Sequence, residues 1–155
     1  MTAYTFDKVK VTPAVQVNGV TSVLGFYELT GALADNDTIG SIPVPDGAII
    51  LKAEVTCSEL DTNGSPTLTL NVGDSTDEDR FVDGATTGAA VNIQGINVST
   101  VTSNAVATGK GYTYSDSSVT TGLGGEILIT VDGSPATAAT TGHVILEVQY
   151  TLDAY

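Results

Sequence analysis

Apolar and polar residues alternate with a period of two through the C-terminal part of the chain. From Ile127 to Asp132, every second residue is apolar, and the same pattern runs from Val144 to Asp153 with the apolar residues at even positions. This spacing predicts strands with one buried face, because successive side chains of a strand point to opposite sides of the sheet. The sequence Asp132-Gly133-Ser134-Pro135 between the two segments is typical of a turn.

Two further alternating segments lie earlier in the chain. In residues 51–58 the apolar side carries Leu51, Ala53, Val55 and Cys57, and residues 67–72 place Leu68, Leu70 and Val72 together. Less regular patterns predict short strands at Thr5–Val11, Gly25–Leu33, Thr38–Val44, Ile93–Thr102 and Gly111–Tyr114. The five prolines fall where these strands are expected to begin or end, because proline donates no ladder hydrogen bond.

These segments predict an all-β fold in a single domain that spans residues 1–155. About eight or nine short strands separated by turn residues favour one antiparallel β-sandwich with jelly-roll topology and at most one or two short helical turns. The best helical candidate is the turn at Asp74–Arg80. Shared parity predicts one core between two sheets, formed by Leu68, Leu70, Val72, Ile127, Ile129, Val131, Val144, Leu146 and Val148.

The balance of acidic and basic residues limits the kinds of partner that the chain is expected to bind. Lys and Arg number 5 against 18 Asp and Glu, so the formal net charge is -13. We therefore expect no nucleic acid and no anionic membrane as partner, because both require clustered cations. A hydrophobic content of 41% and a mean hydropathy of +0.18 exclude a disordered acidic tail. Charged residues make up only 15%, so Thr, Ser, Asn and Gly are expected to cover much of the surface.

The ends of the chain and its reactive residues exclude further classes. The N-terminus has no basic stretch before an apolar one, and no apolar run approaches the roughly 20 residues of a membrane helix, so we expect no secretory signal and no membrane span. With one Cys and one His, the chain forms neither an internal disulfide nor a two-His metal site.

An acidic run, GDSTDEDRF, offers the clearest candidate site. Clustered carboxylates at Asp74, Asp77 and Asp79 suit a calcium ion, which prefers oxygen ligands, but their spacing does not match a helix-loop-helix calcium loop. The favoured interpretation is a turn that needs no metal, in which Asp74 or Ser75 caps a short helix and carboxylates hold Arg80. A second acidic group, residues 35–37, is expected to be a solvated loop.

Catalytic chemistry has little support. His143 is the one candidate general base, and no G-x-S-x-G nucleophile motif accompanies it, so a strand-edge histidine is the better interpretation. Cys57 lies on the apolar side of its strand and is expected to be an inert core thiol. Tyr112 and Tyr114 share a strand face, which is weak support for a sugar-stacking platform in a chain without Trp. The Gly-rich stretches match neither the P-loop nor a dinucleotide-binding loop. We expect no catalytic residue and no cofactor.

One stretch resembles a known family. In Thr67–Gly84, TLTLNVGDSTDEDRFVDG, a strand ending in Val-Gly-Asp precedes an acidic turn ending in Asp-Arg-Phe. With the upstream segment IPVPDGAII (Ile42–Ile50) and the Gly- and Thr-rich strands that follow, it resembles small virion proteins of tailed bacteriophages, called decoration, cement or head-stabilising proteins. The resemblance implies a non-enzymatic β-sandwich that coats the outer capsid surface of a virion, binds the major capsid protein and forms a homo-oligomer, most plausibly a trimer.

Two other functions stay open. A carbohydrate-binding or adhesin-type β-sandwich of a phage tail or bacterial surface would bind glycans, and a small hydrolase fits least because the chain has a single His. The N-terminal stretch is apolar at Tyr4, Phe6, Val9 and Val11, so residues 1–23 are expected to form an arm that lies against a neighbouring subunit or a capsid.

Overall fold

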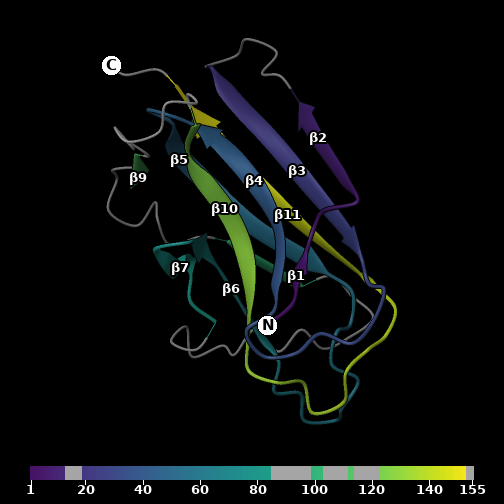
Figure 1. Ribbon diagram of the computed structural model, residues 1–155. Coiled ribbons are helices and arrows are strands. Elements are labelled where there is room, and N and C mark those ends of the chain that lie inside the picture. The colour runs from purple at the N-terminus through teal and green to yellow at the C-terminus, as the bar shows by residue number, and fades with distance from the viewer. Residues whose placement is uncertain (13–18, 85–98, 103–111, 114–122, 153–155) are drawn as a thin grey trace.

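The computed structural model describes residues 1–12, 19–84, 99–102, 112–113 and 123–152, and it contains two sheets (Figure 1). The first sheet has the spatial order β1 (Ala3–Tyr4), β4 (Thr38–Pro45), β10 (Leu123–Asp132), β6 (Thr69–Asp74), β7 (Asp77–Val82). The second has the order β2 (Lys8–Thr12), β3 (Val20–Glu28), β11 (His143–Thr151), β5 (Ile49–Cys57), β8 (Ser99–Thr102), and β9 (Tyr112–Thr113) also pairs with β5.

The order of the strands is that of a jelly roll. Leaving out the N-terminal strands β1 and β2 and the short β9, the sheets read β4-β10-β6-β7 and β3-β11-β5-β8. Chain neighbours such as β3, β4 and β5 therefore alternate between the sheets, and the last two strands, β10 and β11, sit inside them. Between the described strands, all pairs are antiparallel except β1 with β4. The predicted all-β sandwich is confirmed.

The core lies between the sheets and matches the predicted alternation. All nine residues predicted to form it are at most 2% exposed, namely Leu68, Leu70, Val72, Ile127, Ile129, Val131, Val144, Leu146 and Val148. In β11, which pairs with β3 on one side and β5 on the other, buried and half-buried residues alternate along the whole strand. A central strand of this kind has one face on the core and one toward solvent, which is why its sequence alternates so clearly.

The predicted parity of β5 is wrong at one residue. Ala53, Val55 and Cys57 are buried as expected, but Leu51 is half-buried and Ile50 takes its place in the core. Gln149 of β11 pairs with Lys52, whereas Tyr150 pairs with Ile50, so Leu51 is the extra residue of a β-bulge. The bulge reverses the facing of all residues before it.

Two other local predictions differ from the structure. Asp74–Arg80 is a β-hairpin between β6 and β7 rather than a helical turn, and the described residues contain no helix. Pro43 lies within β4 instead of at its end, opposite Glu126 of β10. It is tolerated there because β1 pairs only with Thr38 and Ile39, which leaves the rest of that side of β4 as a sheet edge.

The N-terminal segment runs along both sheets at one side of the sandwich. β1 pairs with β4 and β2 pairs with β3, so residues 5–7 cross from one sheet to the other. Phe6 packs against the core at this crossing. In the single chain, residues 3–4 and 8–12 of the expected arm thus pair with the chain's own strands, and β3 begins at Val20, inside the predicted limit of residue 23. Contact with a neighbour stays a prediction.

Candidate interaction surface

The acidic hairpin between β6 and β7 is organised around Asp74. Its side chain is 8% exposed and accepts hydrogen bonds from the backbone amides of Thr76 and Asp77 at 2.9 and 3.0 Å and from the Thr76 hydroxyl at 2.6 Å. Arg80 Nε donates to the other carboxylate oxygen at 2.6 Å. Asp74 therefore caps the turn and holds Arg80, but the element that it caps is a hairpin and not the predicted short helix.

The other two candidate calcium ligands lie together on β7. The side chain of Asp77 is 41% exposed and its Oδ2 lies 3.5 Å from Arg80 Nη1. A hydrogen bond with Asp77 raises the pKa of Asp79, and burial and the negative charges of Asp77 and Asp83 raise it further. Within the described ranges, no three His, Cys, Asp or Glu side chains converge on a common position that would hold a metal ion.

The residues considered for catalysis contribute to the packing and hydrogen bonding of the fold. His143 starts β11, and its ring stacks on Phe26 with a centroid separation of 6.0 Å. Ser58 Oγ lies next to it, but accepts from the His143 backbone amide at 2.9 Å, so this Ser–His contact does not involve the imidazole. Cys57 is 1% exposed in the core, as predicted. Tyr112 is part of β9, and Tyr114 lies outside the described residues.

Two buried carboxylates were missed or misplaced by the sequence analysis. Asp61 is 1% exposed and accepts backbone hydrogen bonds from Thr67, Ala136 and Thr137 at 2.8 to 2.9 Å. Burial opposes its ionisation, but these amides outweigh burial and hold the pKa of Asp61 well below its usual range. Asp37, expected in a solvated loop, is 2% exposed and accepts from the amides of Thr2 and Ala34.

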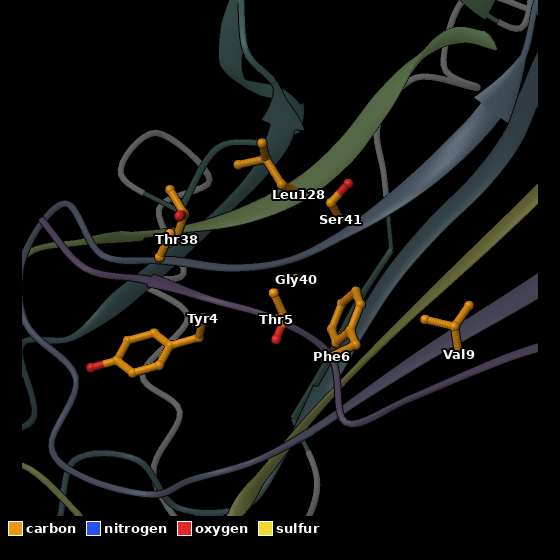
Figure 2. A pocket seen from close by; sticks show the side chains of 9 residues that line it. Tyr4, Thr5, Phe6, Val9, Thr38, Gly40, Ser41 and Leu128 are labelled. Atoms are coloured by element: carbon orange, nitrogen blue, oxygen red, sulfur yellow. The ribbon is translucent and has the colours of Figure 1, made fainter. Parts of the chain in front are cut away.

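A shallow hollow of about 420 Å³ lies beside the N-terminal segment (Figure 2). Phe6 and Val9 face it from the N-terminal segment, and Leu128 and Ser41 contribute from β10 and β4. Its lining is mainly apolar, and Val9 is 49% exposed. Such a hollow suits packing against another surface better than acid–base chemistry.

Two edge strands, one from each sheet, carry opposite charges. β2 ends the second sheet and bears exposed Lys8 and Lys10, whereas β7 ends the first sheet and bears Asp77, Glu78 and Asp79. The described residues thus form two charged edges and an apolar hollow. No helix in the described part of the chain is long and apolar enough to cross a membrane.

Comparison with known proteins supplies the biological setting. No protein-family model and no curated protein matches the chain. A chain of the cyanophage Pam1 capsid asymmetric unit is 29% identical, with a TM-score of 0.64, over 93% of this chain and 94% of that one. The chain is similar to a phage capsid protein. A chain of the capsid of Ralstonia phage GP4, 22% identical with a TM-score of 0.59 over 94% and 93% of the two chains, shares the fold.

Both alignments run through nearly the whole of each chain. The similarity to these chains therefore extends over most of the length of the chain. The resemblance to phage virion proteins that was inferred from Thr67–Gly84 is thus confirmed at the level of phage capsids.

Proposed function

We propose that this chain is a structural virion protein that decorates or cements a bacteriophage capsid by binding the major capsid protein. The observation that carries the proposal is the full-length similarity to a chain of the Pam1 capsid, at 29% identity. A fold alone does not define a function, because jelly-roll domains occur in proteins with many different functions. Sequence identity along the entire domain adds the support that the fold lacks.

The surface chemistry supports a coat role. Charged residues are only 15% of the chain, and Val9 and Leu152 are half-exposed apolar side chains. The apolar hollow beside Phe6, Val9 and Leu128 brings several apolar side chains together and favours contact with another protein. A net charge of -13 opposes a location against packaged DNA. We therefore place the chain on the outer capsid surface.

The polar residues support a non-enzymatic role. Asp61 and Asp37 are engaged by backbone amides, Asp74 holds Arg80, and the Ser58 hydroxyl hydrogen-bonds the backbone of His143. Each of these groups stabilises a loop or a strand end. The self-association implied by the family resemblance, with a trimer as the favoured state, belongs to the same proposal.

Binding to capsids is the direct test. Purified chain is mixed with capsids of its phage that lack it and is sedimented through a cushion, with capsids of an unrelated phage as the control. We expect saturable binding to its own capsids and a higher temperature of capsid disruption, because a bound partner stabilises the state it binds. Failure to bind these capsids contradicts the proposal. Saturable binding to a polysaccharide instead would favour the carbohydrate-binding alternative.

A further inference from the structure

The first observation is a basic edge, formed by Lys8 and Lys10 of β2. These are two of only five Lys and Arg residues in the chain, and both are exposed. Lys8 pairs with Phe26 and Lys10 with Leu24, so both lysines project from the outer face of the second sheet. The neighbouring Asp7 accepts the amide of Glu28. Lys52 and Arg80, by contrast, are already ion-paired within the chain.

The second observation is an acidic edge, formed by Asp77, Glu78 and Asp79 of β7. Arg80 is committed mainly to the buried Asp74 and lies 3.5 Å from Asp77. Among the described residues, these three consecutive carboxylates share the guanidinium of Arg80 as their neighbouring cation. The hydrogen bond with Asp77, burial and like charge raise the pKa of Asp79, as expected where carboxylates lie close together.

The two edges are similar in length. β2 has five residues and β7 has six. On β2, Lys8 and Lys10 lie two residues apart on one strand face, about 6.6 Å along an extended chain. On β7, the three carboxylates are consecutive residues at a register shift of the pairing with β6. Within the described ranges, β2 pairs with β3 alone and β7 with β6 alone, so each strand offers its other side to a strand of another chain.

The edges also lie on opposite sides of the sandwich (Figure 1). β1 and β2 are joined by only three residues and end the two sheets on one side, whereas β7 is the other end of the sheet that contains β1. One chain therefore cannot pair its own two edges. Copies related by rotation, however, can each present a basic edge to one neighbour and an acidic edge to the other.

We propose that copies of this chain associate head to tail, with β2 of one copy alongside β7 of the next and Lys8 and Lys10 facing the carboxylates of β7. Contacts of this heterologous type close into rings when the rotation between copies allows it. This inference deepens the self-association within the proposed function. Capsid binding does not depend on it.

Charge-swap variants of the full chain test the pairing in sedimentation velocity at low and high salt, with no capsid present. Lys8→Glu/Lys10→Glu makes both edges acidic, and Glu78→Lys/Asp79→Lys makes both basic. We expect each variant alone to associate at least about tenfold more weakly than wild type, and an equimolar mixture to associate again, because acidic and basic edges then alternate. Circular dichroism verifies that both variants fold.

A matched pair of variants separates edge contact from net charge. Lys8→Gln/Lys10→Gln and Thr140→Glu/Thr141→Glu change the net charge by the same amount, but Thr140 and Thr141 are exposed residues of the loop before β11. We expect weaker association only in the lysine variant. Equal loss in both variants, a mixture that stays dissociated, or a monomeric wild type at low salt would each overturn the proposal. In the separate capsid-binding test, a wild type that associates with itself but does not bind its capsids would contradict the proposed function alone.

Discussion

At the scale of single residues, buried carboxylates hold the loops of this sandwich in place. Asp61 joins the loop after β5 to the loop after β10, because its two oxygens accept amides from both. Asp37 similarly ties the N-terminus to the turn before β4. A carboxylate that accepts several backbone amides satisfies donors that would otherwise be buried without partners.

Asp61→Asn tests this role through its pH dependence. The Asn side chain has the same shape as Asp61 but no charge, and its NH2 group points at backbone N–H groups that need an acceptor. We therefore expect the free energy of unfolding to fall by about 2 kcal/mol at pH 7. The pKa of Asp61 is lowered in the folded state from 3.8, so the stability it contributes is complete above that pH and is lost as pH falls below it. Urea titrations should show a smaller difference between variant and wild type at pH 3 than at pH 7. An equal difference at both values would contradict a role of the charge.

Asp74→Ala tests the metal-free hairpin. The variant removes the acceptor of two backbone amides and of Arg80, and we expect a loss of about 1–3 kcal/mol. Asp79→Asn is the matched control. The pKa of Asp79 is raised, which means that the folded state disfavours its ionised form. Replacing it by the neutral Asn should therefore not lower the stability of the protein at pH 7. Thermal unfolding of wild type should be the same with calcium and with chelator. A marked rise of Tm with calcium would instead indicate a metal site at Asp74, Asp77 and Asp79.

At the scale of elements, Phe6 of the N-terminal segment packs over two glycines, one from each sheet. A Cβ at Gly25 of β3 or at Gly40 of β4 would collide with the ring of Phe6. Gly40 also has a φ of 64°, in the left-handed region that favours glycine, at an irregularity where β4 pairs with β10. The missing side chains create the space in which Phe6 connects the two sheets.

A double-mutant cycle between Phe6 and Gly25 measures this packing. Phe6→Ala should lower the free energy of unfolding by about 2 kcal/mol, since the half-buried ring is lost from the core edge. Gly25→Ala should cost a similar amount, about 1–3 kcal/mol, by displacing the ring. In the Phe6→Ala background the glycine substitution should be nearly neutral, with a coupling of about 1–2 kcal/mol in urea unfolding. Additive losses would show that Phe6 does not occupy the space over Gly25.

At the scale of the whole molecule, the jelly roll is complete without its first two strands. β3 to β8 with β10 and β11 form both four-stranded sheets, and β1 and β2 extend one side. The N-terminal segment therefore adds stability and the basic edge to a fold that the later strands already define. It also covers the outer side of β3 and the first two residues of β4, which would otherwise be open edges.

Deletion of residues 1–12 should leave a folded sandwich with a lower Tm. The sheet signature in circular dichroism should persist, because the nine predicted core residues all lie outside the deleted segment. Sedimentation should show loss of self-association and reduced attachment to capsids, since the arm and the basic edge are removed together. A truncated chain that fails to fold would show that β1 and β2 are integral to the core, and one that assembles normally would contradict the role of the N-terminal segment.

Local sequence was sufficient for the elements that alternate cleanly. β10 and β11 were predictable because a strand with one buried face places apolar residues at every second position. This rule holds whichever strands lie on either side of it. The all-β class, the sandwich and the burial of Cys57 followed from the same rule. The family resemblance also came from local sequence, the stretch Thr67–Gly84.

Tertiary structure decided what depends on partners that are distant in the chain. The bulge at Leu51 is set by the pairing of β5 with β11, and no residue of β5 alone encodes it. β7 is a strand because β6 lies beside it, although its acidic sequence is equally suited to the start of a helix. In the sequence, Asp61 is indistinguishable from any other aspartate in a loop. It becomes a buried hydrogen-bond acceptor because residues 136 and 137 donate their backbone amides to it. Likewise, the basic and acidic edges became opposite sides of one sandwich only through the order of strands in the sheets, which no short segment of sequence specifies.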